Sequence, residues 1–144
     1  VNKWDLIEKN DRTMNRYVEE IRYQAEFLKY APITFVSALT GQRVLEVLDI
    51  VNYVANQHAR RVKTNVLNNV IKEAVAMFTP PANKQGKRLK IYYATQPKVK
   101  PPLFVLFVND PELMHFSYKR YLKNQIRKEI GFEGTPIKIK VRKR

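Results

Sequence analysis

The sequence predicts a mixed α/β protein in two parts. Residues 1–61 have the pattern of the last strand and helix units of an α/β domain. Residues 62–144 have that of a small α+β domain with a three-stranded sheet packed on helices. Apolar stripes at helical spacing, two adjacent strand patterns and an abrupt change of charge carry this prediction. The first part holds 9 Lys and Arg against 8 Asp and Glu, and the second holds 18 against 5.

Two strand patterns organise the second part. Residues 88–96 have a period of two, which places alternate side chains on opposite faces and is typical of a half-buried strand. Residues 103–108 are all apolar, which predicts a central strand covered on both faces. Pro97, Pro101 and Pro102 predict a loop between them, because proline cannot donate to a strand ladder. The side chains expected on one face of the first strand are Leu89, Ile91, Tyr93 and Thr95, with Lys90, Tyr92, Ala94 and Gln96 on the other.

The first part predicts a helix, a strand and a second helix in that order. The first helix should begin with Thr13 as its N-cap, and residues 33–36 should form a short buried strand. The second helix should begin near residue 42. Its side chains expected to face inward are Val44, Val47, Leu48, Val51, Val54 and Ala55. This order is typical of an α/β unit with a parallel sheet.

The second part predicts the order helix, strand, strand, helical region, strand. The first helix should have Thr64 as its N-cap, and the helical region runs from Asp110, as its cap, to Ile130. Gly131 should end it in the αL conformation. In residues 137–142 apolar and basic residues alternate, which predicts a third strand with a basic outer face.

Composition excludes several classes of protein. With no cysteine, the chain has no disulfide, thiolate zinc site or cysteine nucleophile, which suits a cytoplasmic protein. No apolar run approaches the roughly 20 residues of a membrane span. His58 and His115 lack acidic partners at ligand spacing, so we expect no metal site. The net charge of +14 lies almost wholly in the second part and favours a nucleic-acid partner over a merely solubilising surface.

Two short motifs in the first part point to guanine. Residues 2–5 read NKWD, and residues 37–39 read SAL. They resemble the N-K-x-D motif of P-loop GTPases and the S-A-K/L motif that follows it by one helix and one strand. A carboxylate such as Asp5 can accept both adjacent donors of guanine, which adenine lacks. The resemblance implies that Asn2 contacts the other base edge and Lys3 packs across its face. It also implies that the Ala38 N–H, between Ser37 and Leu39, bonds the guanine O6.

The phosphate-binding motifs of such GTPases are missing from this chain. No glycine completes G-x-x-x-x-G-K-[ST] or a magnesium-site D-x-x-G. Because those motifs hold the phosphates and the chemistry, we expect this chain alone not to hydrolyse GTP. The chain begins at Val1 within a motif, so we expect it to be a fragment of a GTPase that uses GTP or GDP with Mg²⁺.

The second part resembles a type II KH arrangement and, more specifically, the KH-like domain of the bacterial Der (EngA) GTPases. The segments that carry the second resemblance are residues 88–96, 102–110, 116–118 and 131–136. The resemblance covers the whole chain and implies that residues 1–61 are the end of the second of two G domains and that residues 62–144 are the KH-like domain. It also implies a cytoplasmic ribosome biogenesis factor. It implies that the KH-like domain docks on the rRNA of the large ribosomal subunit or on a neighbouring G domain of the same protein, with no membrane partner.

The usual RNA-gripping G-x-x-G loop of KH domains is missing between the expected helices. Gly131 and Gly134 form such a string, but Phe132 and Glu133 between them suit a helix cap and turn. RNA contact is therefore expected through basic patches. The candidates are Lys87, Arg88, Lys98, Lys100, Lys119, Arg120, Lys123, Lys138, Lys140 and Arg142. The aromatic residues of the strands, Tyr92, Tyr93, Phe104 and Phe107, are expected in the core.

Two alternatives to the GTPase interpretation stay open. One is a free-standing basic RNA-binding adaptor without nucleotide chemistry, whose first part only imitates a G domain. The other is a KH-like domain that serves mainly as an intramolecular interaction module.

Overall fold

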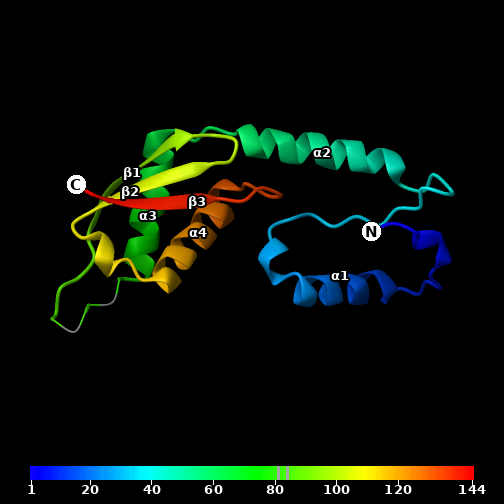
Figure 1. The fold of residues 1–144 in the computed structure, drawn as a ribbon, viewed down its shortest axis with the longest axis horizontal. Helices are drawn as coiled ribbons and strands as arrows, with labels where there is room; N and C mark the ends of the chain where they lie inside the picture. Colours follow the sequence, from blue (N-terminus) through cyan, green and yellow to red (C-terminus); the bar gives the residue numbers. More distant parts are fainter. Residues whose placement is uncertain (81, 84) are drawn as a thin grey trace. The chain divides into compact units, whose positions relative to one another are not determined.

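The computed structural model describes residues 1–80, 82–83 and 85–144. The chain divides into two compact units, Val1–Asn56 and Gln57–Arg144 (Figure 1). In the described part of the chain no helix has the length and apolar character that crossing a membrane requires. Within the same residues, no group of three or more potential metal ligands comes together.

The first unit is built around three aromatic rings. It contains the 3-10 turn η1 (Trp4–Leu6), α1 (Thr13–Gln24), the 3-10 turn η2 (Glu26–Leu28) and most of α2 (Val44–Ala59). Trp4 and Phe35 are buried with their ring centroids 4.4 Å apart, and the ring of Tyr17 from α1 meets Trp4 edge-on at 5.6 Å. These rings hold α1 to the extended segment around Phe35.

The structure corrects three expectations for the first unit. Thr13 is the first helical residue, and its hydroxyl bonds Asn10 instead of capping the helix. Residues 33–36 are extended and hydrogen-bonded to the first residues of the chain, but they form no strand. No residue of α2 is buried, so its apolar stripe does not face inward within the described residues. Leu48 and Val51 of that stripe are 60% and 56% exposed.

The second unit is a three-stranded sheet with two helices on one face. Its elements are α3 (Thr64–Met77), β1 (Ile91–Lys98), β2 (Leu103–Val108), the 3-10 turn η3 (Pro111–Leu113), α4 (Phe116–Ile130) and β3 (Lys138–Lys143). The strand order is β1-β2-β3, with β1 antiparallel and β3 parallel to β2. As predicted, β2 is central and spans residues 103–108 (Figure 1). The expectation that both of its faces are covered is wrong, because the helices pack on one face only and Leu103 and Phe107 are half-buried on the other.

The core of the second unit lies between the sheet and the helices. Phe104, Leu106 and Val108 of β2 are fully buried in one cluster with the apolar stripes of both helices. The buried helix residues are Leu67, Val70, Ile71 and Ala74 of α3 and Tyr118, Leu122, Ile126 and Ile130 of α4. The predicted alternation along β3 and the residue before it is confirmed, with Ile137 and Ile139 buried and Lys138 and Lys140 exposed.

A β-bulge in β1 changes which residues face the helices. Ile91 pairs with Val108 but Tyr93 pairs with Phe107, so the register shifts by one residue between them. Beyond the bulge, Ala94 and Gln96 are buried, whereas Tyr93 is 41% exposed. The expectation that Tyr93 and Thr95 share a face with Leu89 and Ile91 is therefore wrong. The expectation that the strand aromatics lie in the core is right for Phe104 and wrong for the other three. Tyr92 and Tyr93 are exposed, and Phe107 is half-buried outside the core cluster.

Thr64 is the first residue of α3 and not its N-cap, which is Lys63.

Two connections also differ from expectation. Pro97 lies within β1 and not in the loop, which is possible because β1 is an edge strand. The expected helical region from Asp110 is two elements, since Met114 and His115 leave helical geometry between η3 and α4. The Asp110 carboxylate caps η3 by accepting from the Glu112 N–H, as predicted.

Gly131 ends α4 but not in the αL conformation, since its φ is 107° and its ψ is −123°. Its N–H still donates to Arg127, and residues 133–134 form a turn, as expected of a cap and turn. A Cβ on Gly131 would lie 3.2 Å from the guanidinium of Arg60 and 3.4 Å from the Gln57 amide oxygen. Backbone conformation and close packing therefore both favour glycine here.

The Gln96 side chain joins the sheet to the segment before α3. Its amide oxygen accepts from the buried Val62 N–H at 2.7 Å, and its amide nitrogen donates to the Arg60 carbonyl at 2.9 Å. Gln96 is only 6% exposed, so water does not replace these bonds. The side chain thus satisfies two backbone groups in the segment that leads into α3.

We expect Gln96→Ala to destabilise the second unit by about 1–3 kcal/mol for each backbone group left without a partner. Urea unfolding followed by circular dichroism checks this. Trp4, the single tryptophan, reports the first unit by fluorescence and should show an unchanged transition. Asn124→Ala, at an exposed position of α4, is the control; an equal loss in both variants would contradict the role of Gln96.

Two tyrosines of α4 bind backbone carbonyls of the α3 segment. The hydroxyl of Tyr118 donates to Phe78 and that of Tyr121 to Ala74, both at 2.9 Å. Burial, with a smaller contribution from Tyr121, raises the pKa of Tyr118 to about 12. The ionised form is therefore less favourable in the folded protein than in the unfolded chain.

This raised pKa predicts a pH-dependent stability. As the pH rises above the unfolded value of about 10, the unfolded chain loses the Tyr118 proton first, so the free energy of unfolding should fall up to about pH 12. Urea midpoints measured across this range for Tyr118→Phe should fall less steeply. Tyr23→Phe, at a side chain 88% exposed, should keep the wild-type slope. Identical slopes for all three proteins would refute the assignment to Tyr118.

Candidate functional site

The two guanine-type motifs lie side by side in the first unit. The N–H of Trp4 donates to the Val36 carbonyl at 3.0 Å, and the N–H of Val36 donates to the Val1 carbonyl at 2.8 Å. These bonds join the start of the chain to the segment that leads into Ser37. Although about 35 positions separate the motifs, the fold brings both to one place.

Asn2 links the motifs directly. Its side-chain oxygen accepts from the backbone N–H of Ala38 at 3.0 Å and from that of Lys3 at 2.8 Å. Lys3 has a φ of 64°, in the left-handed region, and precedes η1. The Ala38 N–H, which was expected to donate to guanine O6, thus donates to Asn2 in this structure. A base bound here would share or displace that hydrogen bond.

The remaining motif residues differ in exposure. Asp5 is half-buried in η1, and its carboxylate makes no hydrogen bond or ion pair with any residue the structure describes. Ser37 is fully buried, and its hydroxyl accepts from the Thr40 N–H at 3.2 Å. Leu39 is 86% exposed. Asp5 can therefore accept donors from a ligand, while Ser37 shapes the turn that presents Ala38.

The candidate RNA contacts fall on different sides of the second unit. Lys138, Lys140 and Arg142 are exposed on β3, on the face of the sheet that the helices do not cover. Lys119, Arg120 and Lys123 lie on α4, in the helical layer. Lys98 ends β1, and Lys100 lies in the following loop, where its N–H donates to the His58 carbonyl at 3.1 Å. Lys119 lines one pocket together with Lys140 and Arg142, so it joins the cations of β3, while the other candidates on α4 lie apart from them.

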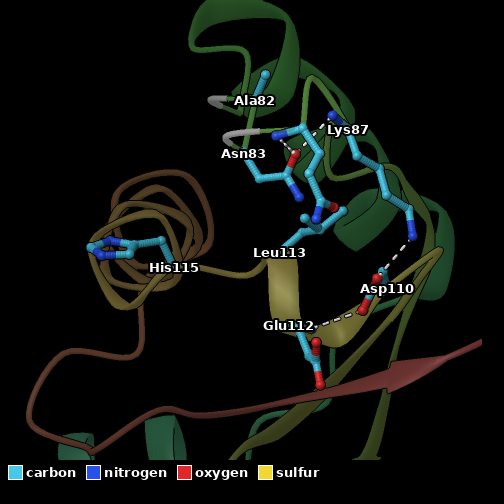
Figure 2. A pocket seen from close by; sticks show the side chains of 8 residues that line it. Ala82, Asn83, Lys87, Asp110, Glu112, Leu113 and His115 are labelled. Atoms are coloured by element: carbon cyan, nitrogen blue, oxygen red, sulfur yellow. Dashed lines mark hydrogen bonds and ion pairs between the residues drawn. The ribbon is translucent and has the colours of Figure 1, made fainter.

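Lys87 lines a pocket that also contains two carboxylates. Figure 2 shows Lys87 and Asp110 pointing toward one another across a pocket of about 530 Å³, and their charged atoms are 3.0 Å apart. The hydrogen bond from Lys87, with a second from the Glu112 N–H, lowers the pKa of Asp110. Glu112 also lines the pocket. Arg88 lies just beyond, exposed. Lys87 is thus neutralised by a carboxylate, which makes it a poor phosphate ligand.

Sequence reasoning missed an aromatic pair on the open face of the sheet. Tyr93 and Phe107 stack with ring centroids 4.4 Å apart and planes 16° from parallel. The bulge in β1 turns Tyr93 to this face, and no feature of the alternating pattern in residues 88–96 marks the bulge. The stack could be found only from the strand register.

Comparison with known proteins agrees with this architecture. Residues 61–142 match the family described as the KH-domain-like C-terminal domain of EngA bacterial GTPase enzymes. The chain is 57% identical over its whole length to the GTPase Der of Alkaliphilus oremlandii. It is 60% identical, again over 144 residues, to that of Geobacillus thermodenitrificans. It covers 32% and 33% of these two proteins, so it spans about a third of their length.

The family match covers more than half of the chain and coincides with the sheet and both helices of the second unit. The chain therefore belongs to the family of KH-like C-terminal domains of the EngA (Der) bacterial GTPases.

Proposed function

We propose that this chain is the C-terminal region of a GTP-binding and GTP-hydrolysing factor for biogenesis of the large ribosomal subunit. In this proposal residues 1–61 read the guanine base and residues 62–144 dock on rRNA or on a neighbouring G domain. The likeness to proteins named GTPase Der supports the first half of the proposal, and the positive charge of the second part supports the second.

One observation carries the nucleotide proposal. Asn2 of one guanine-type motif holds Ala38 of the other at 3.0 Å, while the Asp5 carboxylate stays without a partner among the described residues. A half-buried carboxylate in one motif and a backbone donor in the other match guanine, which presents two donors and one acceptor along this edge. The phosphates and Mg²⁺ would be held by motifs that this chain lacks, so this chain by itself should not hydrolyse GTP.

Asp5→Asn in the intact protein that carries this chain tests the base-reading role. An amide cannot accept both guanine donors, so GTP affinity should fall by roughly 10- to 100-fold, as expected for charged hydrogen bonds of about 1.5–3 kcal/mol. Xanthosine triphosphate offers an acceptor in place of one donor, so it should bind more tightly to Asp5→Asn than to the wild type. Fluorescent-nucleotide competition measures both affinities.

The control for this experiment is Glu8→Gln, which removes an exposed carboxylate just after η1. It should leave both affinities unchanged. An unaltered preference for GTP in Asp5→Asn would count against the base-reading role and would favour an RNA-binding adaptor without nucleotide chemistry.

The docking role predicts salt-dependent RNA binding by this chain. Each phosphate contacted should lower log K by about 0.7 per tenfold increase in salt, because bound counterions are released. Titration of ribosomal RNA fragments at several salt concentrations measures this slope. No binding near physiological salt would argue against rRNA docking and would favour the neighbouring G domain as the partner.

A further inference from the structure

The face of the sheet opposite the helices is composed of three mixed rows. We name it the outer sheet face. Because Cα partners on adjacent strands place their side chains on the same face, the register defines each row. The rows are Tyr93–Phe107–Arg142, Thr95–Val105–Lys140 and Lys98–Leu103–Lys138. Each row therefore has an apolar residue in the centre, on β2, and a cation on the edge strand β3.

The aromatic pair gives this face a flat apolar surface. Tyr93 and Phe107 stack on one another, so each ring still has a second face. Tyr93 is 41% exposed, whereas Val105 in the next row is only 6% exposed. Exposed aromatic rings on a sheet can stack with nucleic-acid bases, and such stacking tolerates any base.

The cations form a line beside the aromatic pair. Lys138, Lys140 and Arg142 are all exposed, and alternate residues of a strand lie roughly 6.4–6.8 Å apart. None of the three forms an ion pair with a residue that the structure describes. No carboxylate lies in any of the three rows. The outer sheet face thus attracts anions and has no acidic side chain of its own to neutralise its charge.

We propose that the outer sheet face binds single-stranded RNA, with bases stacked against Tyr93 and phosphates along Lys138, Lys140 and Arg142. This proposal rests on the proposed function, in which the second unit binds RNA, and assigns the contact to a particular face. A duplex fits less well because its bases already stack on one another and its major groove is deep and narrow. An acidic protein would use the cations but would leave the aromatic pair without a matching partner.

Substitution of Tyr93 tests the stacking contact. Fluorescence anisotropy with labelled oligouridylate, and with an RNA duplex of the same length, measures the affinity of the whole chain. Tyr93→Ala should lower the affinity for the single strand about 10-fold, because stacking contributes about 1–3 kcal/mol per base. It should change the affinity for the duplex little. Tyr93→Phe should bind like the wild type. Tyr93→Leu, which keeps apolar cover over the sheet, should also lose affinity, and it replaces the alanine variant if that one does not fold.

The matched control is Phe116→Ala, which removes a ring 71% exposed at the start of α4. It should leave both affinities unchanged. An equal loss of single-strand affinity in the Phe116 and Tyr93 variants, or no loss in Tyr93→Leu, would overturn the stacking role.

Two triple variants separate this face from general electrostatics. Lys138→Ala/Lys140→Ala/Arg142→Ala and Arg120→Ala/Lys123→Ala/Lys128→Ala each remove three positive charges, but the second set lies on α4. The first set should reduce the salt slope by about 0.7 for each lost phosphate contact. The second should leave the slope near the wild-type value.

The remaining outcomes distinguish this inference from the proposed function. If the wild type binds neither RNA, rRNA docking itself fails. If the wild type binds RNA but both triple variants lose affinity equally, the outer sheet face is not the site, although docking stands. If polyglutamate displaces the RNA from wild type and Tyr93→Leu alike, the face is a general anion site and the single-strand assignment is wrong.

Discussion

The β-bulge between Ile91 and Tyr93 determines the composition of both faces of the sheet. Side chains alternate along a strand, so one extra residue moves the side chains after it to the opposite face, here as far as a second register shift between Thr95 and Lys98. Before the bulge, Leu89 and Ile91 face the helices. After it, small Ala94 and polar Gln96 do, which lets α3 approach the sheet and lets Gln96 reach the backbone before α3. The same shift brings Tyr93 to the outer sheet face beside Phe107.

Polar side chains hold the segments around this sheet. The side-chain oxygen of Gln57 accepts from the Phe132 N–H, and Arg60 donates to the Ile130 carbonyl at 2.7 Å. His58 and the buried Thr135 form a hydrogen bond of 2.6 Å, and Arg127 donates to the carbonyls of Phe132 and Thr135. The connection from α4 to β3 therefore has its backbone groups satisfied by side chains where no ladder can supply partners.

Local patterns predicted the elements whose burial depends on neighbouring residues in the chain. The bounds of β2, the alternation of β3, the stripe of α3 and the Asp110 cap could all be derived this way. The bulge, the break at Met114 and the exposure of α2 could not, because each depends on packing between distant segments. The same holds for the candidate site: the motif residues were predictable, but the bond between Asn2 and Ala38 joins positions 36 apart.

The exposed apolar stripe of α2 has a consequence for its dynamics. A helix of 16 residues without tertiary support is only marginally stable in water. Its last turn is secured through Gln57 and His58, whereas no residue toward its first turn is buried. Local opening should therefore begin at Val44 and become progressively rarer toward Ala59. We therefore expect α2 to unfold from Val44 while its last turn stays folded with the KH-like unit.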